Sequence, residues 1–214
     1  AAGVATHGSR GLYLLGYLAQ TGLICFGPRD GKQQTFVLLD GWVPATRDLE
    51  RDVALGTLAR RYFTSHGPAT VYDFAWWSGL AVTDARSGLE SVKSELASET
   101  RDGRTVWFAA SRFPRPSRGG RVHLLPAWDE FTVAYRDRSD ILDPRHALRV
   151  NAGGGVLKPV VVVEGEVVGT WQRTLTTHGV RVKPALFKKI DEADRRGLAE
   201  AVARYGRFLG VKAE

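Results

Sequence analysis

The feature that most constrains the fold is a run of three helical segments and a hairpin between residues 52 and 110. Apolar residues recur at helical spacing over residues 52–65, which predicts an amphipathic helix that ends at the segment SHGP. Thr70 can cap a short helix over residues 70–77, because Asp73 follows three residues later and can complete a capping box.

A third helix is predicted from Thr83, as its cap, to about Ala97, and the segment ETRDGRTVWFA then predicts a hairpin with an Asp-Gly turn. Three helices followed by a hairpin are typical of a winged helix-turn-helix unit. A helix over residues 9–20, followed by the strands LICFG and QTFVLLD, predicts the C-terminal part of another such unit. The sequence thus predicts tandem winged helices, a partial one at 1–43 and a complete one at 52–110.

The second half of the chain changes to strands and turns. The segment VHLLPAWDEFTVAYRD alternates apolar and polar residues in its second half, VLKPVVVVEGEVVGTWQRT has the spacing of a hairpin, and VRVKPALF adds a strand. A final amphipathic helix is predicted over residues 189–209. For residues 111–214 we therefore expect a small, curved antiparallel sheet or barrel with that helix packed on it. The predicted fold class of the whole chain is α+β.

The positive charge lies in this second half. Residues 111–214 hold 19 Lys and Arg against 12 Asp and Glu, whereas the two kinds balance in residues 1–110. Within ten residues that carry no acid lie Arg112, Arg115, Arg118 and Arg121. Their Pro and Gly neighbours exclude a helix or a central strand, and such a loop suits phosphate backbones because guanidinium groups bind phosphates and release counterions. A solvated loop that only keeps the protein soluble is the alternative. The other candidate DNA contacts in this half are Arg145, Arg149, Lys158 and Arg173.

The predicted third helix carries more acids than bases, which argues against its insertion into a DNA groove because phosphates would repel it. It holds Arg86 and Lys93 with Asp84, Glu90 and Glu95.

Two adjacent tryptophans, Trp76 and Trp77, end the short second helix, where their side chains point about 100° apart. One interpretation places one indole in the three-helix core and the other against a neighbouring domain, since exposure of both would forgo about 2 kcal/mol of burial per side chain. Stacking of an exposed indole on a DNA base is the alternative.

We predict no catalytic residue, no metal site and no cofactor from this sequence. One Cys and five scattered His offer no local metal-ligand spacing, and NAGGGVLKP matches neither a Walker A motif nor a dinucleotide fingerprint. On a strand, Asp129 and Glu130 would point to opposite faces, so we expect one of them to be buried and paired with Arg136 or Arg138; a catalytic acid is the alternative. With no membrane-spanning run and no signal peptide visible, we expect a cytoplasmic, nucleoid-associated protein without a membrane partner. The oligomeric state is not predicted.

Three long segments, LARRYFTSHGPATVYDFAWWSGL, LLPAWDEFTVAYRDRSDILD and GVLKPVVVVEGEVVGTW, resemble in this order a family of bacterial winged-helix DNA-binding proteins. That family includes DNA glycosylases that excise alkylated purines and unhook interstrand crosslinks. The resemblance covers essentially the whole chain. It implies tandem winged helices followed by a β-barrel around a concave basic channel, with double-stranded DNA, including damaged DNA, as the partner.

The resemblance also implies a catalytic motif of Gln, an aliphatic residue and then Gln or Asp in the first winged helix, which would position water against C1′ of the damaged nucleoside. The segments KQQTF and TWQRT do not match it. The chain has no Met and opens like the middle of an element, so we expect a fragment of a glycosylase without the catalytic part, inert by itself. A family member that binds DNA without this chemistry is the alternative.

Two other functions remain open at this point. A winged-helix transcriptional regulator would bind one specific site and be sensitive to Arg86→Ala, and a protein-interaction module would not bind DNA at all.

Overall fold

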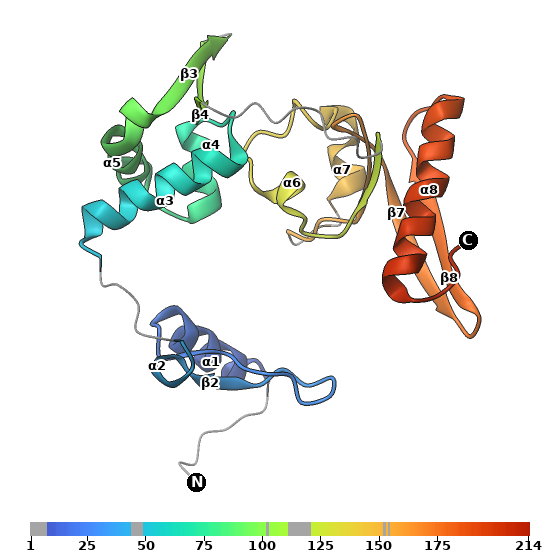
Figure 1. Cartoon of the computed structure of the whole chain (residues 1–214), viewed down its shortest axis with the longest axis horizontal. Helices are drawn as coiled ribbons and strands as arrows, with labels where there is room; N and C mark the ends of the chain where they lie inside the picture. Colours follow the sequence, from blue (N-terminus) through green and yellow to red (C-terminus); the bar gives the residue numbers. More distant parts are fainter. Residues whose placement is uncertain (1–7, 44–48, 102, 111–120, 152, 154) are drawn as a thin grey trace. The chain divides into compact units, whose positions relative to one another are not determined.

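The computed structural model of the chain (Figure 1) describes residues 8–43, 49–101, 103–110, 121–151, 153 and 155–214. It divides into two compact units, Ala1–Glu50 and Arg51–Glu214, and each is described by itself. Both units combine helices with antiparallel strands, so the fold is of the mixed α and β class that the sequence predicts.

The first unit contains two helices and a two-stranded antiparallel sheet. Its elements are α1 (Arg10–Gln20), β1 (Ile24–Phe26), β2 (Phe36–Leu38) and α2 (Leu39–Trp42). None of the residues in these four elements is buried, and large apolar side chains such as Leu12 and Tyr13 are exposed. These elements therefore do not enclose a core of their own.

The second unit begins with three helices around one core, followed by a hairpin. The elements are α3 (Arg51–His66), α4 (Val71–Ser78), α5 (Val82–Val92), the 3-10 turn η1 (Lys93–Glu95), β3 (Leu96–Arg101) and β4 (Arg104–Ala109). The core contains the fully buried rings of Tyr62, Phe63 and Phe74. Helices α3 and α5 approach closely at Gly88, where a Cβ atom would lie 2.8 Å from the carbonyl oxygen of Leu55. The order of elements predicted over residues 52–110 is thus present.

Local sequence determines where α4 begins and ends. The backbone N–H of Asp73 donates to the Thr70 hydroxyl, and the backbone N–H of Thr70 donates to the Asp73 carboxylate at 2.9 Å, which completes the predicted capping box. Gly79 ends the helix with φ of +70°, a conformation that is costly for residues with a Cβ atom.

Both boundaries predicted for the third helix are wrong. Helix α5 starts at Val82 after Ala81, so Thr83 lies inside its first turn and is not the cap. It ends at Val92 instead of near Ala97, because Leu96 already has extended backbone and pairs with Ala109 in the hairpin.

The rest of the second unit is built on a four-stranded antiparallel sheet. Its strands are β5 (Val122–Leu125), β6 (Val160–Val163), β7 (Glu166–Thr176) and β8 (Gly179–Leu186), in the order β5-β6-β7-β8. In this order β5 and β8 are the two edges, and no pairing joins them within the described residues. The described strands therefore form an open sheet and not the predicted barrel, which would require the edge strands to pair.

Strand β6 is buried on both faces of this sheet. Val161 and Val163 belong to a core that α8 (Glu192–Leu209) covers, whereas Val160 and Val162 belong to a second core with Phe131 and Leu142, among others. Helix α8 corresponds to the predicted terminal helix.

The polypeptide between β5 and β6 differs from the prediction. The alternating segment that predicted a strand forms the helical turn α6 (Glu130–Val133) instead, and Asp129 caps it by accepting from the backbone N–H of Phe131 at 3.0 Å. The 3-10 turn η2 (Pro144–His146) and the helical turn α7 (Ala147–Val150) follow. Asp129 and Glu130 thus lie at a helix start and not on opposite faces of a strand.

Candidate functional site

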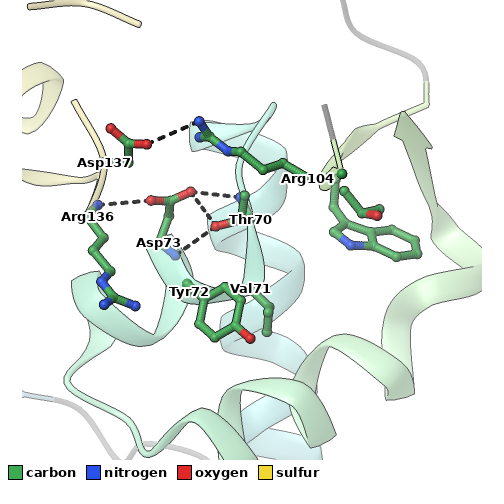
Figure 2. A pocket seen from close by; sticks show the side chains of 10 residues that line it. Thr70, Val71, Tyr72, Asp73, Arg104, Arg136 and Asp137 are labelled. Carbon is green, nitrogen blue, oxygen red and sulfur yellow. Dashed lines mark hydrogen bonds and ion pairs between the residues drawn. The ribbon is translucent and has the colours of Figure 1, made fainter. Parts of the chain in front are cut away.

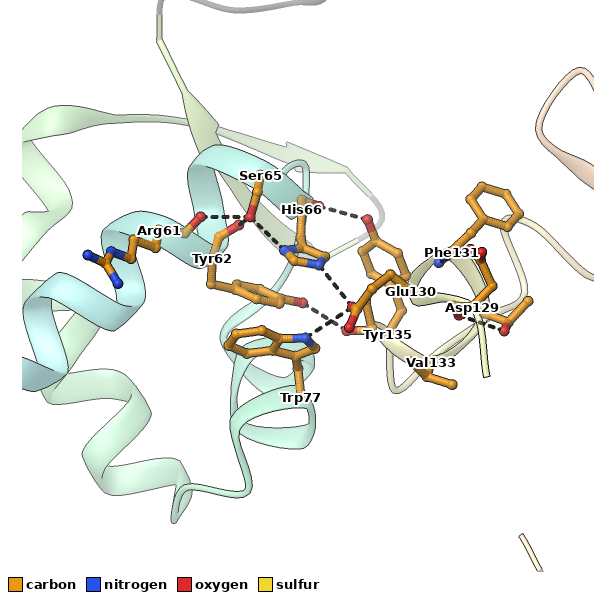
Figure 3. Close-up of polar contacts among 12 residues, drawn as sticks. Arg61, Tyr62, Ser65, His66, Trp77, Asp129, Glu130, Phe131, Val133 and Tyr135 are labelled. Atoms are coloured by element: carbon orange, nitrogen blue, oxygen red, sulfur yellow. Dashed lines mark hydrogen bonds and ion pairs between the residues drawn. The ribbon is translucent and has the colours of Figure 1, made fainter. Parts of the chain in front are cut away.

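Residues 126–137, which we call the docking segment, bind the three-helix core through side chains of α3 and α4 (Figure 3). The Glu130 carboxylate accepts from His66 Nε2 and from Trp77 Nε1, both at 3.1 Å. Trp76 Nε1 donates to the Val133 carbonyl, also at 3.1 Å. Both indole N–H groups are therefore directed to the docking segment. The Trp77 ring packs against the three-helix core, whereas Trp76 is 55% exposed.

Two tyrosines strengthen the same joint. The fully buried Tyr62 donates to the Ala134 carbonyl at 3.0 Å, and Tyr135 donates to the His66 carbonyl at 2.9 Å. Burial raises the pKa of both phenols above the ordinary value, and nearby Asp73 adds to this effect. The hydroxyls therefore stay protonated, and able to donate, to a higher pH than that of an ordinary tyrosine.

The order Ser65, His66 and Glu130 resembles a nucleophile, base and acid, but the hydrogen bonds do not support that chemistry. Ser65 Oγ lies 2.8 Å from His66 Nδ1 and also donates to the Arg61 carbonyl one helical turn earlier, at 2.8 Å. Ser65 has one hydroxyl proton, and the Arg61 carbonyl competes with the imidazole nitrogen for it at the same distance. Glu130 also accepts from Trp77, so we interpret this group as the structural centre of the joint and not as a catalytic triad.

A cavity of about 610 Å³ lies where the start of α4, the β3–β4 hairpin and the end of the docking segment meet (Figure 2). Its lining includes Tyr72, Asp73, Arg104 and Arg136. Asp73 is only 4% exposed, and its carboxylate accepts from Thr70 and, at 2.9 Å, from the backbone N–H of Arg136. The predicted burial of Asp129 or Glu130 was wrong, because Asp129 is half-buried and Glu130 is exposed, and neither forms an ion pair with Arg136 or Arg138 in the described structure. The buried carboxylate at this place is Asp73, which bonds the backbone N–H of Arg136 and not its guanidinium.

Arg104 of the hairpin lies 3.1 Å from Asp137 at the same cavity. Hydrogen bonds from Ser139 hold the pKa of Asp137 below its usual value, and the Arg104 charge adds to this effect. The cavity therefore contains two satisfied carboxylates, and the guanidinium of Arg104 is already paired.

Three of the predicted arginines, Arg112, Arg115 and Arg118, lie outside the described residues. Arg121 and Arg145 are paired with acids. Arg121 lies 3.2 Å from Glu164 and 3.4 Å from Asp194. Arg145 lies 2.6 Å from Asp143, and its hydrogen bonds lower the pKa of that carboxyl to about 2. Both guanidinium charges are thus largely neutralised within the chain.

Arg149, Lys158 and Arg173 have no acidic partner among the residues that the structure describes. Arg149 lies 5.3 Å from the ring centre of Phe187, and Arg173 donates to the hydroxyl of Tyr205. These aromatic neighbours hold the guanidinium groups of Arg149 and Arg173 in place without cancelling their charge. Arg149, Lys158 and Arg173 therefore remain able to bind an anion.

Sequence reasoning missed one cationic group as a site. Arg86 and Arg136 both lie beside Tyr72, although they are 50 positions apart in the sequence.

In the described part of the chain no group of three His, Cys, Asp or Glu side chains could hold a metal ion. None of the described helices is long and apolar enough to cross a membrane.

Comparison with known proteins gives one consistent family. The family model described as DNA glycosylase AlkZ-like matches residues 3–208. An interstrand DNA cross-link repair glycosylase of Streptomyces sahachiroi is 29% identical over 166 residues, which cover 72% of this chain and 44% of that protein. The structure of Streptomyces sahachiroi DNA glycosylase AlkZ matches with a TM-score of 0.77 and 24% identity, over 96% of this chain and 58% of that one. The chain spans about half the length of these two relatives. It belongs to the DNA glycosylase AlkZ-like family.

Proposed function

We propose that this chain binds double-stranded DNA, mainly through the phosphate backbone and DNA shape, as part of a DNA-repair glycosylase. Membership of the AlkZ-like family is the observation that carries this proposal. The charges of Arg149, Lys158 and Arg173, which have no acidic partner among the described residues, support it, because such cations release counterions when they bind phosphates. Arg149 and Arg173 are exposed, and Lys158 is half-buried. Damaged duplexes are proposed as ligands on the same grounds.

We also propose that the chain consists of three domains. Helices α3, α4 and α5 with the β3–β4 hairpin form a complete winged helix over residues 52–110, and residues 1–43 supply the C-terminal part of another. Residues 111–214 form a third domain. The order of helices and strands supports these boundaries, and the hydrogen-bonded docking segment supports a structural role for Trp76 and Trp77.

The phosphate contacts are tested by the salt dependence of DNA binding. Fluorescence anisotropy with an undamaged labelled duplex gives the slope of log Kd against log salt concentration. A variant that combines Arg149→Gln, Lys158→Gln and Arg173→Gln should lower the slope by about 2.7 if each side chain contacts one phosphate, at about 0.9 per contact. Arg115→Gln combined with Arg118→Gln should lower the slope by about 1.8 if both side chains contact phosphates, and an unchanged slope would refute the role of the arginine-rich loop.

The matched control combines Arg121→Gln with Arg145→Gln. These side chains already have acidic partners, so their loss should change the slope much less. An equal effect per charge in both variants would show that net charge alone matters and would overturn the assignment of contacts.

We propose that the chain itself does not excise bases, because its sequence lacks the Gln-aliphatic-Gln or Gln-aliphatic-Asp motif. Incubation with duplexes that contain alkylated purines should leave no alkali-labile abasic sites, and their appearance would contradict this proposal. One tight sequence-specific site would instead support a transcriptional regulator, and an absence of DNA binding would support a protein-interaction module.

A further inference from the structure

The acidic residues of helix α5 form ion pairs in the folded chain, although the sequence alone predicts that their negative charge repels DNA phosphates. Asp84 lies 2.9 Å from Arg51, and Glu90 lies 3.1 Å from Lys93. Glu95, just beyond the helix, accepts two hydrogen bonds from Arg60 at 2.7 and 2.8 Å. Arg86 is thus the cation of α5 that remains without an acidic partner within the described residues, and the electrostatic objection to phosphate binding is removed.

Arg86 meets a second arginine at the exposed ring of Tyr72. Arg86 Nη2 donates to the Tyr72 hydroxyl at 2.9 Å, so its guanidinium lies at the hydroxyl end of the ring. The guanidinium carbon of Arg136 lies 5.9 Å from the ring centre, and that of Arg86 lies 5.7 Å from it. Tyr72 is 43% exposed. Arg136 also has no acidic partner in the described part of the chain. Two uncompensated cations therefore share one aromatic support at the surface.

Hydrogen bonds at the start of α4 fix the positions of Tyr72 and Arg136. The capping box fixes the first turn of α4, which carries Tyr72. The backbone N–H of Arg136 is bonded to the buried Asp73, as Figure 2 shows. Asp73 is engaged by three hydrogen bonds, and Asp137 is paired with Arg104, so neither carboxylate is left to neutralise the two arginines.

We propose that Arg86, Arg136 and the Tyr72 hydroxyl clamp the phosphates of one DNA strand at the surface of α4 and α5. Each guanidinium keeps N–H donors for phosphate oxygens, and the hydroxyl accepts from Arg86 while its own proton can be donated. The clamp contacts the backbone and not base edges, so it adds affinity without sequence preference. This proposal rests on the proposed function and adds a contact surface on the helical part of the chain.

The test measures the anisotropy salt slope for the whole chain and for Arg86→Gln, Arg136→Gln and the double variant. Each single change should lower the slope by about 0.9 and the double change by about 1.8, one counterion contact per arginine. Tyr72→Phe keeps every charge, so it should weaken binding while the slope stays unchanged. Circular dichroism spectra and thermal midpoints verify that the variants fold, which is expected because all three side chains are exposed.

Arg61→Gln is the matched control, since Arg61 is an exposed arginine of α3 and no acid pairs with it among the described residues. It should keep the slope of the original chain. An equal loss in Arg61→Gln and in the clamp variants would overturn the proposal in favour of a net-charge effect.

Two further outcomes separate the clamp from the proposed function. If the unchanged chain binds DNA but the double variant keeps its slope, the clamp is refuted and DNA binding stands. If the unchanged chain does not bind DNA, the proposed function itself fails. Calorimetric titration with inorganic phosphate tests whether the site binds a free small anion instead of DNA. If the double variant abolishes phosphate binding but leaves the DNA salt slope unchanged, the site binds a small anion and the proposal is overturned.

Discussion

The substitution Tyr62→Phe tests how firmly the docking segment is joined to the three-helix core. Tyr62 and Ala134 are both completely buried, and the phenol hydroxyl donates to the Ala134 carbonyl at 3.0 Å. The change keeps the ring and its packing but leaves a buried carbonyl without this donor, which costs about 1–3 kcal/mol. We expect the free energy of unfolding in urea, followed by circular dichroism, to fall by this amount with an unchanged m-value.

Tyr135→Phe is the control from the same joint. It removes a similar hydrogen bond, to the His66 carbonyl at 2.9 Å, but Tyr135 is only half-buried and water can replace part of the bond. Its cost should be smaller, about 0.5–1.5 kcal/mol. Tyr62→Phe without a measurable loss, or a larger loss for Tyr135→Phe, would refute the assignment of Tyr62 as the buried link.

The remaining predictions concern pH, packing and charge. Burial raises the pKa of Tyr62 and Tyr135, so their stabilising contribution is complete below the ordinary tyrosine pKa of about 10 and is lost above it. The thermal midpoint should therefore fall as the pH rises beyond about 10, and the decrease should be smaller in Tyr62→Phe. Gly88→Ala should destabilise the chain, because contact with the Leu55 carbonyl costs about 1–3 kcal/mol and exceeds a gain of about 1 kcal/mol in helix propensity. Gly56→Ala should be tolerated in the same thermal assay, since its closest neighbour is the rotatable Ser91 hydroxyl. Asp143→Asn should release Arg145 and raise the DNA salt slope by about 0.9.

The helices were predictable because their signals are local. The capping box of Thr70 and Asp73 and the apolar spacing of α3 and α8 depend on residues within a few turns. The strand predicted through Glu130 was wrong, because the Asp129 cap outweighed the alternation that follows it. Closure of a sheet depends on pairing between distant strands, so four sequential strands could not be distinguished from a barrel by their pattern.

The candidate sites depend on contacts that no local pattern contains. The bonds of Trp76 and Trp77 lead to residues more than 50 positions away, at Val133 and Glu130. Asp84 and Glu95 are neutralised by ion pairs with two arginines of α3, Arg51 and Arg60. The charge of α5 counted from the sequence therefore differs from the charge that its surface presents.

DNA binding through phosphates is tested most directly by measuring Kd for two undamaged duplexes of unrelated sequence across a series of NaCl concentrations. Similar affinities and one common slope of at least about 4.5 are expected if Arg86, Arg136, Arg149, Lys158 and Arg173 each contact one phosphate, and each contact from the arginine-rich loop would add about 0.9. A flat salt dependence, a strong preference for one duplex, or no binding would contradict it.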